Sequence, residues 1–163
     1  IQNPEVALHR ALHIKALIKK TGADKNEPGA GIDIRLSIGI GEKTYQGSRV
    51  SESNGPAYVR AGEKFDLLRR EHSIFGLESP WPDFNEEMNL IFRLASLFMN
   101  EWSVSSAALM ELVLENPGAT QHELGLKLGI KQNSVSGRWK RACVSEVLAM
   151  DALYRKKLNR LLA

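Results

Sequence analysis

A run of basic side chains near the C-terminal end of the chain is the stretch best suited to an anionic partner. Residues 129–142 have the sequence GIKQNSVSGRWKRA, which contains four basic residues and no acidic one. Lysine and arginine side chains bind phosphates, and the glutamine and asparagine of the same stretch can hydrogen-bond to base edges. The alternative is a solvated helix whose exposed face happens to be basic.

The distribution of charge favours an anionic partner for the same region. The 163 residues include 22 Lys and Arg against 19 Asp and Glu, a formal net charge of +3. Residues 103–163 carry +4 and the remaining residues carry −1. A basic region joined to a nearly neutral one indicates two roles, one of which faces an anionic partner such as nucleic acid. An excess of this size can also arise by chance.

The apolar residues of positions 120–142 have the spacing of a helix-turn-helix. Leu124 and Leu128 share one face of a short helix, Gly129 lies where the chain must turn, and Ile130 fills the turn. The inner face of a second helix is then formed by Val135, Trp139 and Ala142. A short helix, a turn of a few residues with glycine, and a second helix are the parts of this DNA-binding motif.

Steps of 100° per residue leave the second helix with a polar outer face. Eight residues on or beside this face are expected to contact DNA: Lys131, Gln132, Asn133, Ser134, Ser136, Arg138, Lys140 and Arg141. The first turn is expected to meet base edges, and the later basic residues are expected to meet phosphates. Arg138 lies on the flank, where an intramolecular salt bridge is an equal alternative. A helix-turn-helix can also be only a structural or protein-binding element.

The ending VSGRWKRA resembles the DNA-binding modules of response regulators and of the last region of sigma factors, which share a VSxRxxRA pattern. The chain departs from these modules at Gly125, where they usually have alanine. Glycine costs roughly 0.5–1 kcal/mol of helix propensity relative to alanine, and it lets the two helices approach more closely.

The rest of the chain predicts alternating helices and one strand. Pro4 begins a helix that continues to about Ile18, residues 23–31 form a loop, and the alternation of residues 32–40 predicts a strand with one buried face. Residues 41–54 form a second loop, and Pro56 begins a helix. Its inward residues are expected to be Ala57, Ala61, Phe65 and Leu68.

Two prolines in residues 77–84 predict a boundary. Asp83 with Glu86 then suggests a capping pattern for a long helix, and Ser103 is expected to cap a further helix that ends near Glu115. The predicted fold class is α+β, with an α/β half in residues 1–80 and an all-α helix-turn-helix domain in residues 81–163. Because the chain begins with Ile1, we expect that a segment precedes it.

The first half resembles class III nucleotide cyclase domains, which have a ferredoxin-like fold. The similar stretches are PEVALHRALHIKALI, IRLSIGIG and SNGPAYVRAGEKFDLL. The cyclases have a catalytic asparagine and arginine on the helix that follows the strand, where this chain has Tyr58-Val59 and Glu63. The resemblance therefore implies the architecture without catalytic residues, and the metal-binding carboxylates of such enzymes would lie upstream.

The combination of both halves resembles the SatD family of bacterial proteins. The most specific stretches are RLSIGIGE, SNGPAYVRAGE and LGIKQNSVSGRWKRA. Fuller members begin with a strand and loop of the GDIxxSR type, which this chain lacks. The resemblance implies a cyclase-like half, a C-terminal helix-turn-helix and DNA binding, and it implies no specific reaction.

Other chemistry receives little support from the sequence. Gly39-Ile40-Gly41 lacks the Lys-Ser/Thr of a phosphate-binding loop, which favours the end of a strand. His9 and His13 lie one helical turn apart, but no further ligand completes a metal site in the sequence pattern. Cys143 is expected to pack as a small apolar residue. We therefore predict no catalytic residue, no metal ligand and no cofactor, although the first half is compatible with a nucleotide.

Two functions remain open at this point. The first is a DNA-binding regulatory protein whose cyclase-like half senses a nucleotide or forms a dimer. The second is a nucleotide-processing enzyme whose metal site lies in the preceding segment. The absence of long apolar runs and the single cysteine predict a cytoplasmic protein without a membrane partner. A homodimer on double-stranded DNA is expected, with the apolar residues of 144–163 slightly favoured over the first half as its surface.

Overall fold

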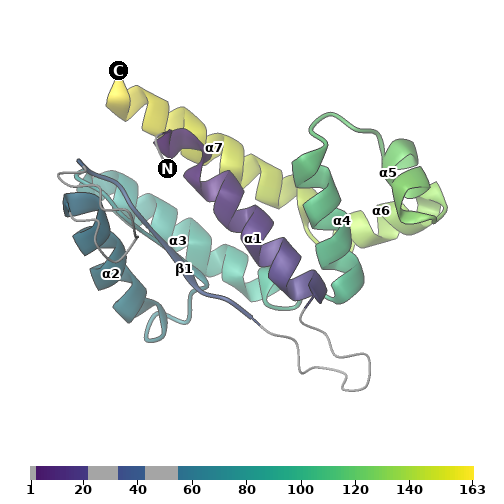
Figure 1. Ribbon diagram of the computed structural model, residues 1–163, viewed down its shortest axis with the longest axis horizontal. Coiled ribbons are helices and arrows are strands. Elements are labelled where there is room, and N and C mark those ends of the chain that lie inside the picture. Colours follow the sequence, from purple (N-terminus) through teal and green to yellow (C-terminus); the bar gives the residue numbers. More distant parts are fainter. Residues whose placement is uncertain (1–2, 22–32, 43–54) are drawn as a thin grey trace, which may run out of the picture. The chain divides into compact units, whose positions relative to one another are not determined.

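The computed structural model describes residues 3–21, 33–42 and 55–163 (Figure 1), and these residues form a mostly helical α+β chain. The first elements are a 3-10 turn η1 (Pro4–Val6), helix α1 (Ala7–Thr21), strand β1 (Leu36–Gly39), helix α2 (Pro56–Leu68) and strand β2 (Phe75–Glu78). The helices that follow are α3 (Pro82–Met99), α4 (Val104–Glu115), α5 (Gln121–Leu128), α6 (Gln132–Arg141) and α7 (Val144–Leu162). The α+β class is confirmed, whereas the cyclase-like arrangement stays a prediction. The loop expected at 23–31 lies outside the described residues, as does most of the loop expected at 41–54.

Contacts divide the chain into two compact units, neither of which is one continuous stretch. Unit 1 consists of Ile1–Ala7, Arg35–Leu97 and Lys156–Ala163. Unit 2 consists of Leu8–Ile34 and Phe98–Arg155. The division into domains at residue 80 stays a prediction, since a unit defined by contacts is not by itself an independently folding domain.

Unit 1 contains two parallel strands connected by α2. The register places Leu36 opposite Phe75 and Gly39 opposite Glu78. Parallel strands need a crossover connection, and α2 supplies it and packs on both strands. A Cβ on Gly39 would lie 1.9 Å from the carbonyl oxygen of Ala57, so only glycine permits this approach of helix to strand. Gly39 is thus the last residue of a strand, as the sequence indicated.

The strand is shorter than predicted, and one inward residue of α2 was assigned wrongly. β1 covers residues 36–39 of the expected 32–40, with Ile38 and Ile40 buried as predicted. Phe65 is 47% exposed, and Lys64 is buried in its stead. The stem of Lys64 lies against Gly76 of β2, while its ammonium group bonds to Glu71 at 2.7 Å. A lysine stem can cover apolar surface in this way, which a count of apolar positions does not detect.

Helix α3 completes the core of unit 1 on β2. Phe75 and Phe92 form an edge-to-face pair with ring centroids 6.0 Å apart. The side-chain amide of Asn89 accepts a hydrogen bond from the Leu77 N–H at 2.9 Å and donates one to the Leu77 carbonyl at 2.8 Å. This pairing satisfies backbone groups of β2 that β1 does not reach. Asp83 lies inside the first turn of α3, so the predicted capping position was wrong.

The described residues of unit 2 are mostly helical, and they include a short helix, a turn and a second helix where the sequence predicts them. α4 begins after Ser103, whose hydroxyl accepts a hydrogen bond from the Ser106 N–H, and it ends at Glu115, both as predicted. α5 and α6 pack against each other and against α4. The Trp102 indole N–H donates to the Ala142 carbonyl at 3.0 Å, which fixes the C-terminal end of α6 within the unit.

Candidate nucleic-acid interface

A complete capping box fixes the start of α5, the first helix of the motif. The Thr120 hydroxyl accepts a hydrogen bond from the Glu123 N–H, and the Glu123 carboxylate accepts one from the Thr120 N–H at 2.7 Å. The backbone bond from Thr120, followed by the bond from its hydroxyl, lowers the pKa of Glu123. The carboxylate therefore remains charged where the helix exposes unpaired N–H groups.

The turn between α5 and α6 depends on two glycines. Gly129 has φ +65° and ψ +31°, a left-handed conformation that favours glycine. Its N–H bonds to the carbonyls of Gly125 and Leu126, and the Ile130 N–H bonds to the Gly125 carbonyl at 3.0 Å. A Cβ on Gly125 would lie only 2.8 Å from the Ile130 carbonyl oxygen. The close approach expected at Gly125 is thereby confirmed.

The inner face of α6 is formed by fewer residues than predicted. Val135 and Ala142 are fully buried, whereas Trp139 is only half-buried. The Trp139 indole N–H donates to the Ser145 hydroxyl at 3.0 Å, at the start of α7. The prediction of Trp139 as a core residue was wrong, because a helical period cannot distinguish the centre of a buried face from its edge.

The outer face of α6 carries the residues expected to contact DNA. Six of these residues lie on it or at its N-terminus: Lys131, Gln132, Asn133, Ser134, Lys140 and Arg141, all of them exposed. Ser136 and Arg138 are half-buried on its flanks. The Arg141 guanidinium lies over Gly137, with its Nη1 atom 3.4 Å from the position of a Cβ there. One face of a single helix thus presents an amide pair at one end and two cations at the other.

The basic side chains of α6 take part in no ion pair within the described part of the chain. The cations of α7 differ from them. Arg155 pairs with Asp151 at 2.5 Å, and Lys157 pairs with Glu87. Of the two alternatives for Arg138, the intramolecular salt bridge therefore finds no acidic partner among residues 3–21, 33–42 and 55–163. The α6 cations remain available for an external anion.

The junction after α6 holds the single cysteine in an unusual backbone conformation. Cys143 has φ +51°, which is uncommon for a residue with a side chain. Its thiol lies 3.7 Å from the Lys140 carbonyl, and burial, followed by the nearby Glu146, raises its pKa. The residue is half-buried, so the expected packing as a small apolar residue is met only in part.

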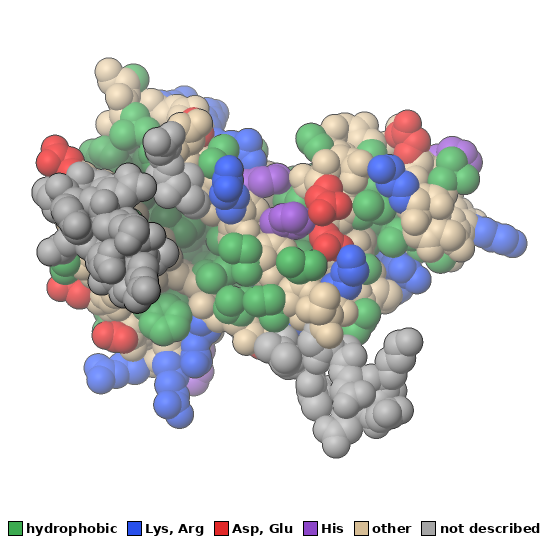
Figure 2. Space-filling view, viewed as in Figure 1, with side chains coloured by type: hydrophobic (Ala, Val, Ile, Leu, Met, Phe, Trp, Pro, Cys, Tyr) green, Lys and Arg blue, Asp and Glu red, His purple; other side chains and the backbone are tan. Residues whose placement is uncertain are grey.

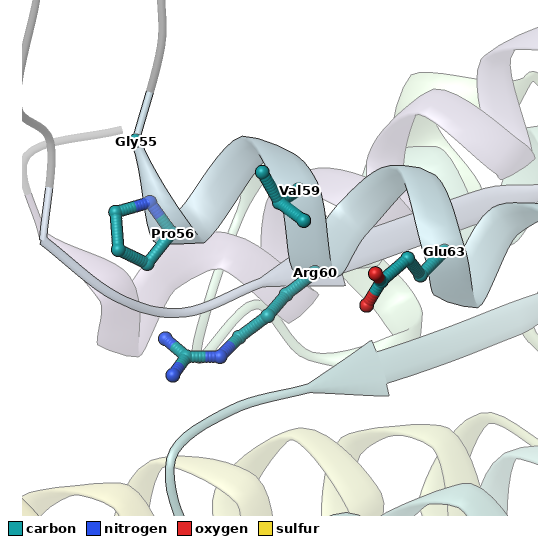
Figure 3. Close-up of a pocket in the computed structure, with 5 residues that line it drawn as sticks. All are labelled: Gly55, Pro56, Val59, Arg60 and Glu63. Atoms are coloured by element: carbon teal, nitrogen blue, oxygen red, sulfur yellow. The ribbon is translucent and has the colours of Figure 1, made fainter.

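Unit 1 has a hollow at the N-terminal end of α2. It is an open hollow of about 480 Å³, lined by Gly55, Pro56, Val59, Arg60 and Glu63 (Figure 3). The Arg60 guanidinium donates to the Ile40 carbonyl at 2.9 Å, which holds its stem against the end of β1. Val59 and Glu63, one helical turn apart on α2, lie beside Arg60 in this hollow. The side chains that line the hollow include one cation, Arg60, and one carboxylate, Glu63.

One group of potential ligands was missed in the sequence. His13 lies beside Glu111 and Glu115 of α4, whereas its expected companion His9 bonds to Asp151 at 3.3 Å. The two acidic residues follow His13 by about a hundred positions, so only the packing of α1 on α4 brings them together. A single signal was present, an acidic residue at position 111 between the apolar residues Met110 and Leu112.

No helix in the described ranges is both long enough and apolar enough to cross a membrane.

Of the eight residues expected to contact DNA, the structure brings all to one helix and its N-terminus. Comparison with protein-family models, with curated proteins and with solved structures finds no match to this chain.

Proposed function

We propose that the protein binds double-stranded DNA and acts as a cytoplasmic regulatory protein, with α6 placed in the major groove. The observation that carries the proposal is the outer face of α6, which is exposed, free of acidic residues and outside the ion pairs of the described residues. The turn geometry supports it, because Gly125 and Gly129 bring α5 and α6 together as the motif requires.

The residues divide into two roles according to their position on α6. Gln132 and Asn133 in the first turn are suited to base edges, since side-chain amides can pair with adenine through two hydrogen bonds. Lys140 and Arg141 are suited to phosphates, and Lys131 and Arg138 have the same role at the flanks. Ser134 and Ser136 contribute hydroxyl groups, and the N-terminal amides of α6 add donors for a phosphate.

Unit 1 is proposed to sense a nucleotide in the hollow beside Arg60, in a cyclase-like half of the kind found in the SatD family. The guanidinium supplies a cation for a phosphate, and Pro56 and Val59 supply apolar surface. The alternative is a nucleotide-processing enzyme whose metal-binding carboxylates lie upstream of Ile1. Tyr58, Val59 and Glu63 favour sensing, because they replace the asparagine and arginine that catalysis would need.

A homodimer is proposed because this motif usually contacts two half-sites about 34–36 Å apart. The surface favoured from the sequence, on residues 144–163, is largely used within the chain. Five of its apolar residues are buried: Val144, Val147, Met150, Tyr154 and Leu158. An exposed apolar row lies instead on α3, where Leu90, Leu94 and Leu97 are 49%, 57% and 73% exposed. We therefore place the dimer surface on α3.

The proposal is tested by selecting bound fragments from a random pool of duplex DNA with the full chain. Enrichment of one sequence, bound more tightly than random duplex, supports a specific regulator. The double variant Lys140→Ala/Arg141→Ala should lose binding to the enriched sequence and to random duplex. The control Lys156→Ala/Arg160→Ala removes the same amount of positive charge from α7 and should retain binding to both kinds of DNA. Equal binding by the two double variants would remove α6 from the interface.

A further inference from the structure

Three side chains in unit 2 gather into a potential metal site. The Nε2 or Nδ1 atom of His13 and one carboxylate oxygen each of Glu111 and Glu115 all lie within 4.8 Å of one another. Glu111 and Glu115 are one turn apart on α4, and His13 faces them from α1. Figure 2 shows histidine side chains next to acidic side chains on the face turned to the viewer, over α1 and α4.

The geometry requires only a small rearrangement to hold an ion. Ligand atoms of tetrahedral Zn²⁺ at about 2.1 Å lie about 3.4 Å from one another. His13 Nε2 and Glu115 Oε1 are already 3.2 Å apart. The side chains of His13 and Glu115 are 38% and 48% exposed, so rotation about their side-chain bonds can close the remaining spacing and solvent ions can reach them.

The existing contacts of the three residues compete with a metal, but they do not block it. Glu111 is 8% exposed, and a buried carboxylate of this kind needs a positive partner. Lys20 is this partner, with its Nζ atom 2.5 Å from the Oε2 atom of Glu111. The Lys20 side chain is itself 42% exposed, so its ammonium group can move into water when a divalent cation takes its place.

We propose that His13, Glu111 and Glu115 bind a divalent transition-metal ion, with Zn²⁺ the best match. Imidazole suits zinc and is a poor ligand for Mg²⁺ or Ca²⁺, and carboxylates complete a set of three protein ligands. A fourth position remains for water. The ion joins α1 to α4, and α4 also packs against α5 and α6. Zinc therefore stabilises the unit that contains the helix-turn-helix.

The test is calorimetric titration of the full chain with ZnCl₂, together with thermal unfolding with and without the metal. We expect one Zn²⁺ per chain and a higher melting temperature, because an ion that binds only the folded state stabilises it. His13→Asn and Glu115→Gln should each weaken binding at least about tenfold, since even changes in outer partners of metal ligands cost that much. An excess of Mg²⁺ should not compete.

Matched controls separate this site from unspecific binding. His122→Asn and Glu146→Gln remove the same side-chain types from exposed positions of unit 2, and Cys143→Ser removes the thiol; all three should bind Zn²⁺ as the unaltered chain does. Glu115 is exposed, so its variant is expected to fold even if a change at His13 does not. The proposal is overturned if the unaltered chain binds no Zn²⁺, or if Glu115→Gln binds it as tightly as Glu146→Gln.

Discussion

Gly125 of α5 lies directly against the carbonyl of Ile130 in the turn, so closely that a Cβ on the glycine would be 2.8 Å from that oxygen. The same carbon would be 3.4 Å from a methyl group of Val135 on α6. The glycine therefore sets the distance between the two helices of the motif. Its weak helix propensity is the cost of this approach.

The first prediction concerns Gly125→Ala. Alanine gains helix propensity but must displace a backbone carbonyl, so we expect a lower free energy of unfolding in chemical denaturation. Gly62→Ala in α2 is the control, because a Cβ there meets nothing within 4 Å. Gly62→Ala should raise the free energy of unfolding by roughly 0.5–1 kcal/mol. If both substitutions stabilise equally, the close packing of the turn is refuted.

The second prediction concerns the capping box. Thr120→Ala should lower the free energy of unfolding by about 0.5–2 kcal/mol, as is usual for a lost cap. The pKa of Glu123 is lowered in the folded chain, so its charged form stabilises the fold above the unfolded pKa. This stabilisation is lost as the pH falls through the lower, folded pKa.

Glu123→Ala should therefore be less stable than the unaltered chain at neutral pH, and the difference should shrink on acidification. Chemical denaturation at a series of pH values measures this difference in the free energy of unfolding. Glu101→Ala removes an exposed acidic residue outside any capping box and serves as the control. A difference for Glu123→Ala that is constant across the series would contradict a role for its charge.

The third prediction concerns base recognition. Gln132→Ala and Asn133→Ala should each weaken binding to a selected site by roughly 1–3 kcal/mol and affect random duplex much less. The reason is their exposed position in the first turn of α6. Fluorescence anisotropy with both duplexes measures the ratio of the affinity for the selected site to the affinity for random duplex. Equal losses on the two duplexes would assign these residues to backbone positioning.

The fourth prediction concerns assembly. The full chain should sediment as a dimer at micromolar concentration, and Leu94→Glu should produce monomers by placing a charge in the exposed row on α3. Leu126→Glu introduces the same change at another exposed leucine, which is 70% exposed on α5, and should leave the dimer intact. A monomeric unaltered chain, or a dimeric Leu94→Glu variant, would count against this surface.

The sequence predicted the features that depend on local spacing. The helices that begin at Pro56 and after Ser103, the turn at Gly129 and the outer face of α6 are all as expected, because each follows from periodicity or capping within a few residues. β2 was not predicted. Residues 75–78 are mostly buried and lack the alternation of a half-exposed strand, so they do not stand out from an apolar helix segment.

The features that were missed depend on contacts between distant residues. Lys15 illustrates this, since a lysine in α1 predicts an exposed side chain. It is instead fully buried and paired with Asp33. Burial lowers the pKa of Lys15, and the bond to Asp33 opposes the shift only in part. The partners of His13 on α4 and the burial of Lys64 escaped prediction for the same reason.

The dependence of DNA affinity on salt tests the central proposal most directly. Each phosphate contact releases a counterion and contributes about 0.9 to the slope of log affinity against log salt concentration. Lys140→Ala and Arg141→Ala should each flatten that slope by about one contact, on selected and random duplex alike, whereas Lys156→Ala should leave it unchanged. An unchanged slope in both α6 variants would contradict the placement of α6 on DNA.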